Sequence, residues 1–138
     1  MIKPKKSLGQ NFINDKNIIK KIINISKIYN KNIIEVGPGL GALTDEIIKQ
    51  KPKKLIIIEK DNEIYKFLKK KYQSDKILLI NDDIMNYNFN KLSNLNIISN
   101  LPYNISSKFL LKILKLNSNI NEIICMIQSE LADKFDYR

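Results

Sequence analysis

The four residues Asn100-Leu101-Pro102-Tyr103 are the part of this chain best suited to chemistry. An amide oxygen and a turn carbonyl can accept hydrogen bonds from an exocyclic amino group, and a phenol ring can stack on the base that carries it. This set would suit methylation of the amino group of an adenine that has flipped out of its stack. The alternative is a turn that closes a strand and packs a tyrosine on it.

Alternating strand-like and helix-like runs must position these groups. Short apolar runs predict strands over residues 32–36, 54–59, 76–80, 95–99 and 122–127. Helical periodicity predicts helices over residues 15–28, 42–49, 62–72 and 106–116, with a short last helix after residue 127. Asp15 is the expected N-cap of the first helix. Continuous apolar strands separated by helices indicate a doubly wound, mostly parallel α/β sheet covered on both faces.

A glycine-rich turn, Gly37-Pro38-Gly39-Leu40-Gly41, follows the first predicted strand and opens a helix. In a doubly wound sheet, ligands bind at the carboxyl ends of the strands, so this turn is a candidate ligand loop. The third glycine comes two residues after the second, whereas the dinucleotide fingerprint needs it three residues after. The spacing therefore disfavours NAD and FAD.

Two carboxylates are expected at the same edge of the sheet. Glu59 ends the second strand, 22 residues after Gly37, where a carboxylate can accept from both hydroxyls of a ribose. Asp83 follows the third strand and could accept from an adenine amino group, with Asp82 as the competing candidate. A nucleoside without a pyrophosphate fits this set, which points to S-adenosylmethionine as the cofactor.

Composition excludes several classes of site. The 138 residues contain no histidine and one cysteine, Cys125, so histidine catalysis and an internal disulfide are excluded and no metal site is expected. Cys125 lies in an apolar run and is expected to be a core thiol. Neither a membrane span nor a signal-peptide core is recognisable, so we expect a soluble, intracellular protein without a membrane partner.

The net charge of +10 is consistent with a polyanionic partner. Of the 24 basic residues, 23 are lysines, and an A/T-rich coding sequence would favour the same composition. The charge therefore gives weak support for nucleic-acid binding. Lysines can attract phosphates, but they do not provide the bidentate base contacts of arginine.

The motifs in order resemble those of the small-subunit ribosomal RNA adenine N6-dimethyltransferase family (KsgA type). The resemblance rests on Lys6-Ser7-Leu8-Gly9-Gln10-Asn11-Phe12, on Glu35 to Thr44, on Glu59-Lys60-Asp61 and on Asn100 to Ser106, and it continues through Met126 to Lys134. Large-subunit RNA methyltransferases of the macrolide-resistance type and DNA adenine methyltransferases are the related alternatives. Leu101 and the N-terminal motif favour the small-subunit branch.

The resemblance implies a Rossmann-like methyltransferase fold with strand order 3-2-1-4-5 and dimethylation of adenines in 16S-type ribosomal RNA, linked to ribosome biogenesis. It implies S-adenosylmethionine binding by Asn11, Ile13, Gly37, Gly39, Glu59, Lys60, Asp83, Ile84 and Asn100. The implied catalytic set is Asn100, Leu101, Pro102 and Tyr103, with Asn100 and the Leu101 carbonyl on the target amine and Tyr103 stacked on the base. The expected partner is ribosomal RNA or a precursor of the small ribosomal subunit.

Family members are about twice as long, so residues 1–138 are expected to form a truncated methyltransferase domain with a basic N-terminal arm at residues 1–14. The chain would lack the last two strands and the C-terminal helical domain, which leaves the fifth strand at a sheet edge. Ser129 stands where the family usually has lysine. A fragment, a decayed gene product, half of a complex and a non-catalytic ribosomal RNA-binding module remain alternatives. A complete protein is expected to be a cytoplasmic monomer, although the sequence does not distinguish the cytoplasm from an organelle.

Overall fold

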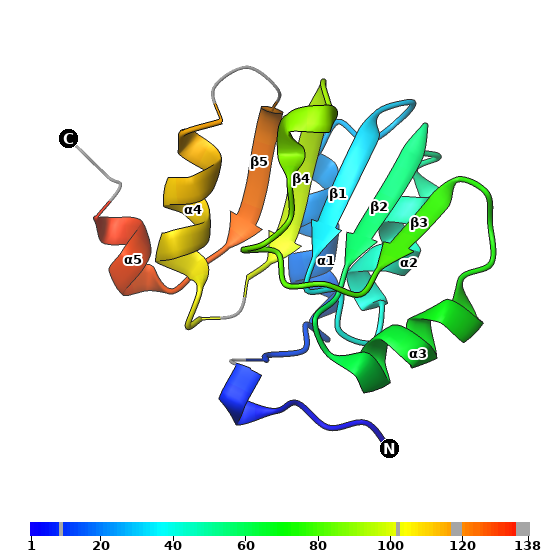
Figure 1. Ribbon diagram of the computed structural model, residues 1–138, viewed down its shortest axis with the longest axis horizontal. Coiled ribbons are helices and arrows are strands. Elements are labelled where there is room, and N and C mark those ends of the chain that lie inside the picture. The colour runs from blue at the N-terminus through cyan, green and yellow to red at the C-terminus, as the bar shows by residue number, and fades with distance from the viewer. Residues whose placement is uncertain (9, 102, 117–119, 135–138) are drawn as a thin grey trace.

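The computed structural model describes residues 1–8, 10–101, 103–116 and 120–134. Its five strands form one parallel sheet in the order β3-β2-β1-β4-β5, as predicted (Figure 1). The strands are β1 (Asn32–Val36), β2 (Lys54–Ile58), β3 (Ile77–Ile80), β4 (Leu95–Asn100) and β5 (Ile120–Met126). The helices are α1 (Lys16–Ile25), α2 (Ala42–Lys49), α3 (Asn62–Lys71), α4 (Ser106–Leu114) and α5 (Ser129–Asp133), with 3-10 turns η1 (Lys6–Leu8) and η2 (Phe89–Lys91).

Adjacent residues along the central strands point to opposite faces, and each face has its own apolar core. Ile33, Leu55 and Ile57 lie in the core under α1, α2 and α3, whereas Ile34 and Ile56 lie in the core under α4 and the segment that joins β3 to β4. Both faces of the sheet are therefore covered. This explains why the strands are continuous apolar runs rather than alternating ones.

Local capping sets where two of the helices begin. Asp15 precedes α1 and accepts from the backbone amides of Asn17 and Ile18, so the predicted N-cap is confirmed. Asp61 caps α3 in the same way, by accepting from the amides of Glu63 and Ile64. Asp61 comes two residues after Glu59, so this cap fixes the end of β2 relative to α3.

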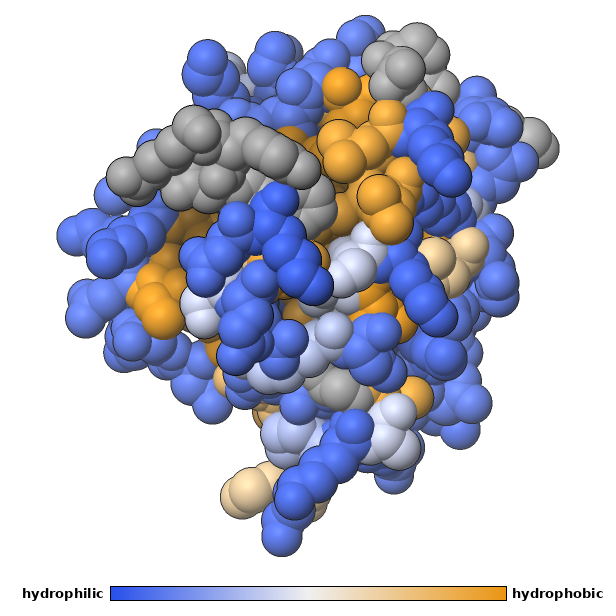
Figure 2. All heavy atoms as spheres, turned by 90° about the vertical axis from the view of Figure 1, so that its left-hand side faces the viewer, coloured by the Kyte–Doolittle hydropathy of each residue, from blue (hydrophilic) through white to orange (hydrophobic). Residues whose placement is uncertain are grey.

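The edge position predicted for the fifth strand is confirmed, because β5 pairs with β4 at one side of the sheet. The apolar side chains of β5 are only half-buried, and Leu111 and Leu114 on the neighbouring helix α4 are each 56% exposed. Figure 2 shows the apolar surface on this side of the molecule. Cys125 packs against the core under α4, as expected of a core thiol, but its place on an edge strand leaves the side chain half-buried.

Among the described residues, no helix is long and apolar enough to cross a membrane.

Candidate functional site

One cavity lies at the carboxyl ends of the strands, where the N-terminal arm passes beneath the sheet (Figure 1). Its lining comes from the arm, the glycine turn, the ends of β2 and β4, and the residues that follow β3. The lining residues are Ser7, Leu8, Gln10, Asn11, Phe12, Val36, Gly37, Gly39, Ile58, Glu59, Lys60, Ile64, Asp82, Asp83, Ile84, Asn100, Asn104 and Ile105. Because parallel strands all end at this edge, segments far apart in sequence converge there.

The cavity brings together most of the residues singled out from the sequence. Asn11, Gly37, Gly39, Glu59, Lys60, Asp83, Ile84 and Asn100 all line it. Among the residues expected to bind the cofactor, Ile13 is the exception, because its side chain packs on the core under α1, α2 and α3 and is not among the lining residues. The side chain of Ile13 packs against that core, so only the backbone of Ile13 could contact a ligand in the cavity.

The glycine turn adopts a backbone shape that other residues rarely take. Gly37, Gly39 and Gly41 have φ angles of 66°, 56° and 91°. The ring of Phe12, from the arm, covers Gly39 so closely that an added Cβ would lie 3.0 Å from its Cδ1 atom. The glycines thus let the arm pack directly on the turn that forms one wall of the cavity.

The end of α3 braces the same turn. The hydroxyl of Tyr72 lies 2.6 Å from Asp45 Oδ1 and 3.1 Å from the carbonyl oxygen of Gly41. The ammonium of Lys71 donates to the carbonyl of Leu40 over 3.2 Å and pairs with Asp45 over 2.8 Å. The ammonium of Lys71 therefore holds the glycine turn from the end of α3.

Glu59 is a buried carboxylate at the end of β2, and only 6% of its surface is exposed. Its Oε1 atom accepts from the backbone amide of Asp61 over 2.7 Å. Burial raises the pKa of Glu59 to about 7, while the amide of Asp61 opposes the rise. A ligand that donates two hydrogen bonds would favour the ionised form of this side chain.

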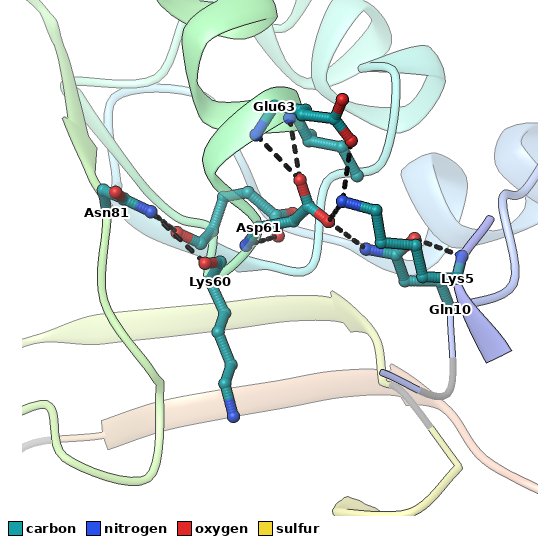
Figure 3. A network of polar contacts seen from close by, with 8 residues as sticks. Lys5, Gln10, Lys60, Asp61, Glu63 and Asn81 are labelled. Carbon is teal, nitrogen blue, oxygen red and sulfur yellow. Dashed lines mark hydrogen bonds and ion pairs between the residues drawn. The ribbon is translucent and has the colours of Figure 1, made fainter. Parts of the chain in front are cut away.

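A polar network ties the N-terminal arm to this strand end (Figure 3). The ammonium of Lys5 pairs with Asp61 Oδ2 and with Glu63 Oε2, each at 2.7 Å, and Gln10 donates to Asp61 Oδ2 over 3.4 Å. Burial alone would raise the pKa of Asp61, but Lys5 and the amides of Ile64 and Glu63 outweigh it and hold the pKa below its usual range. Asp61 is therefore an ionised anchor for the arm.

Asp83 follows β3 and lines the same cavity as Glu59. Its Oδ1 atom accepts from the amide of Met85 over 2.9 Å, and its Oδ2 atom pairs with the ammonium of Lys60 over 2.8 Å. Burial would raise the pKa of Asp83, but Lys60 and the Met85 amide lower it below the usual range. This carboxylate is ionised and oriented, with lone pairs left for a further donor. Asp82 also lines the cavity, and its Oδ1 atom accepts from the amide of Asp83.

Asn100 is oriented by the arm. Its side-chain nitrogen donates to the backbone carbonyl of Asn11 over 2.6 Å, so the amide oxygen is the atom left to accept from a ligand. The side chain of Asn11 in turn donates to the hydroxyl of Tyr103 over 2.9 Å. Beside these contacts, the hydroxyl of Ser99 donates to the carbonyl of Val36 over 2.8 Å and locks the ends of β4 and β1 together.

The rest of the predicted catalytic set is divided between the interior and the surface. Leu101 is buried in the core under α4, whereas Tyr103 is 47% exposed and is linked to Asn100 through Asn11, which contacts both. Pro102 lies outside the described residues. A fixed amide next to a half-exposed phenol is an arrangement that can hold a flat base bearing an amino group.

Glu35 on β1 does not line the cavity. Its Oε2 atom accepts from the hydroxyl of Thr44 on α2 over 2.7 Å, and its buried Oε1 atom has no hydrogen-bond partner among the described residues. Burial raises the pKa of Glu35 to about 8, although the Thr44 hydroxyl opposes this. At neutral pH this side chain is mainly a neutral acid.

Sequence reasoning missed several residues of the site. Lys5, Gln10 and Phe12 join the arm to the cavity, and Asn104 and Ile105 line it after β4. The motifs around these residues can be recognised in the sequence, but the partner of each side chain depends on contacts across the fold. Asp61 gave the one local indication of these contacts. It comes two residues after Glu59, at the position where a helix cap is expected.

In the part of the chain that is described, no group of three or more His, Cys, Asp or Glu side chains could hold a metal ion. The polar groups of the cavity are instead carboxylates and amides with hydrogen-bond partners. They suit an organic ligand with hydroxyl and amino groups.

A family model described as ribosomal RNA adenine dimethylase matches residues 1–136. The chain belongs to this family. The ribosomal RNA small subunit methyltransferase A of Pelagibacter ubique is 45% identical, and the match covers 96% of this chain and 52% of that protein.

Two solved structures of comparable fold extend the comparison. A dimethyladenosine transferase from Plasmodium falciparum has a TM-score of 0.81 at 25% identity and covers 93% of this chain and 47% of its own. The 23S rRNA methyltransferase ErmE has a TM-score of 0.80 at 25% identity and covers 90% of this chain and 50% of its own. This dimethylase-family chain spans about half the length of the curated relatives it matches.

Proposed function

We propose that this chain binds S-adenosylmethionine and carries the methyl-transfer centre of an enzyme that dimethylates adenine amino groups in small-subunit ribosomal RNA. The observation that carries the proposal is the convergence of Glu59, Asp83 and Asn100 on one cavity. Glu59 would bind a ribose, Asp83 a base and Asn100 the target amine.

The residues of the cavity fit the nucleoside part of this cofactor. Glu59 would accept from the ribose hydroxyls, and the ionised Asp83 with the backbone of Ile84 would read the adenine edge. Ile58, Ile64 and Ile84 supply the apolar surface on which a base can rest. The glycine turn and Asn11 would hold the methionine end, and Lys60, paired with Asp83, keeps that carboxylate ionised.

The target adenine would lie beside Asn100 and Tyr103. The amide oxygen of Asn100 would accept one hydrogen from the target amine, and the carbonyl of Leu101 would accept the other. The half-exposed ring of Tyr103 would stack on the base, and its hydroxyl is already tethered by Asn11. The relatives named as ribosomal RNA methyltransferases and the net charge of +10 support an RNA substrate.

When bound, the cofactor supplies an electrophilic methyl group on a sulfonium. The lone pair of the target nitrogen is delocalised into the adenine ring, so it must be localised before it can attack. Two acceptors that draw the amine hydrogens toward a tetrahedral arrangement would localise it toward the methyl group. Positioning and preorganised electrostatics would therefore supply most of the rate acceleration. The proton of the alkylated amine is acidic and can leave to water without a strong base.

The finer assignments follow from the same proposal. The substrate would be 16S-type ribosomal RNA or a precursor of the small subunit, and the compartment would be the cytoplasm. A protein of this family with the full length of the relatives would act as a monomer. Residues 1–138 would form a single methyltransferase domain.

Calorimetric titration of these 138 residues with S-adenosylmethionine tests the proposal first. We expect binding that is lost in Glu59→Ala and retained in Glu130→Ala, which removes an exposed carboxylate on α5. A folded chain that binds no S-adenosylmethionine would contradict the proposal. Binding that survives Glu59→Ala would contradict the assignment of Glu59 to the ribose.

A further inference from the structure

Lys112 on α4 points its ammonium into the segment that joins β3 to β4. Its Nζ atom donates to the backbone carbonyls of Met85 over 2.6 Å, Tyr87 over 2.9 Å and Ile84 over 3.2 Å. An ammonium has three hydrogens to donate, so three carbonyls saturate it. The centroid of the Phe89 ring lies 5.5 Å from the same nitrogen, which adds a cation–π contact.

This lysine is built into the fold. Its neighbours Phe109, Leu110 and Ile113 on α4 are buried in the core on that face of the sheet, and Lys112 itself is half-buried. Burial lowers the pKa of Lys112, while Asp83 and Asp82 oppose this. Removing the ammonium would take this donor from three carbonyls of one turn, and among the described residues only the Ile84 carbonyl would keep a second donor, the amide of Tyr87.

The three carbonyls belong to the turn that directly follows Asp83. The amide of Asn86 donates to the carbonyl of Asp83 over 2.8 Å, and the amide of Tyr87 donates to the carbonyl of Ile84 over 3.3 Å. The Asp83 carboxylate accepts from the amide of Met85. In Figure 1 this green segment leaves β3 and crosses the face of the sheet. Asp83 therefore holds the turn from the side of the cavity, and Lys112 holds it from the side of α4.

We propose that Lys112 is a positioning residue for base recognition, because it fixes the turn that aims Asp83 and Ile84 into the cavity. Lys112 is not among the residues that line the cavity, so it would act only through this turn. The inference rests on the proposed function, and it adds that α4, which follows the methyl-transfer motif, also sets the selectivity of the cofactor site.

A simple structural anchor would behave differently from a positioning residue. If Lys112 only stabilised the fold, its loss would weaken every ligand of the cavity by the same factor. If it aims Asp83, its loss would mainly weaken ligands that carry the 6-amino group of adenine. Two ligands that differ only at the edge of the base that carries this group separate the two cases.

Isothermal titration with S-adenosylhomocysteine and S-inosylhomocysteine makes this comparison. The second ligand has an oxygen in place of the 6-amino group and a hydrogen on N1, so it should bind the unsubstituted chain at least about tenfold more weakly. In Lys112→Met we expect about tenfold weaker binding of the adenosine ligand and less than about twofold change for the inosine ligand. Lys112→Arg, which keeps a cation with several donors, should restore part of the discrimination.

The matched control is Lys115→Met, which removes an exposed lysine from the end of the same helix. It should leave both affinities unchanged. If Lys112→Met does not fold, Lys112→Gln keeps two donors and should show an intermediate loss of discrimination in a chain whose melting curve is cooperative.

Equal weakening of both ligands, or discrimination that survives Lys112→Met, would overturn the assignment of Lys112 alone. An unsubstituted chain that binds the two ligands equally would overturn base reading by Asp83, and the role of Lys112 with it. A folded, unsubstituted chain that binds neither ligand would instead overturn the proposed function.

Discussion

The side-chain nitrogen of Asn100 donates to the backbone carbonyl of Asn11 over 2.6 Å, although 89 residues separate the two in sequence. The contact commits one end of the amide to the N-terminal arm and leaves its oxygen as the acceptor. The arm thereby fixes the orientation of the group that would hold the target amine. The cavity for the cofactor and the candidate site for the target share this one segment of chain.

We expect Asn100→Ala to separate cofactor binding from methyl transfer. It removes an acceptor for the target amine but leaves Glu59, Asp83 and the glycine turn in place, so cofactor affinity should fall by less than about threefold. Methyl transfer to ribosomal RNA, measured with a labelled methyl group, should fall by at least about a hundredfold. Loss of cofactor binding and transfer to the same extent would contradict this division of roles.

Lys5→Met tests the arm as a cover of the cavity. Without its pairing to Asp61 and Glu63, the arm should detach more often, and S-adenosylmethionine should bind about threefold to tenfold more weakly. The loss should appear as faster dissociation in stopped-flow measurements. Affinity of the unsubstituted chain should also fall as salt is added.

Lys3→Met is the control for this experiment, because Lys3 is an exposed lysine of the same arm. It lowers the net charge equally but leaves Asp61 and its partners in place. Equal effects of the two substitutions would mean that overall charge, and not the contact to Asp61, governs binding.

Glu35 should make stability fall as pH rises. The unfolded chain ionises this carboxyl near its ordinary pKa of 4.5, whereas the folded chain keeps it protonated up to about pH 8. Between these values the folded state binds the extra proton, so raising the pH favours unfolding, by about 1 kcal/mol per pH unit. Glu59, with a pKa of about 7, contributes in the same direction only up to that pH.

The pH window between 7 and 8 therefore reports on Glu35. Glu35→Gln keeps the shape of the side chain and an acceptor for Thr44 but cannot ionise. In urea unfolding at pH 6, 7, 8 and 9, the substituted chain should lose less stability between pH 7 and 8 than the unsubstituted one. Parallel pH profiles of the two chains would show that Glu35 is already ionised in the folded state.

Gly41→Ala should destabilise the fold by roughly 2–5 kcal/mol. The φ angle of 91° is unfavourable for alanine, and the new methyl group would come inside contact distance of the Tyr72 hydroxyl. Tyr72→Phe removes that hydroxyl, so the further cost of Gly41→Ala in that background should be smaller. Thermal or urea unfolding of the four chains completes the cycle, and additive effects would exclude a contact between the two positions.

Regular structure was predictable where one strong local signal set each boundary. The strand over residues 32–36 and the helix over residues 42–49 were predicted as found, because an apolar run and a glycine turn define them. The predicted helix over residues 106–116 ends at Leu114 instead, and the fifth strand begins at Ile120, earlier than expected. The 3-10 turn at Phe89 was missed, since it depends on a cap from Asn88 and on burial of one ring.

The site was predictable to the extent that topology alone decides it. Parallel strands end together, so Glu59, Asp83 and Asn100 had to lie near one another once the sheet was inferred. The partners of Lys5 and Lys112 could not be inferred, because the chain has 23 lysines and nothing local distinguishes these two. Their contacts are decided by which backbone oxygens and carboxylates the finished fold leaves unsatisfied.

The contacts of the N-terminal arm also constrain the order in which parts of the chain fold. Asn11 would leave a ribosome well before its partners Asn100 and Tyr103, which follow 89 and 92 residues later. Closing so long a loop is entropically unfavourable until the intervening sheet has formed. The arm should therefore fold last, and its amides should be among the first to exchange hydrogen with solvent.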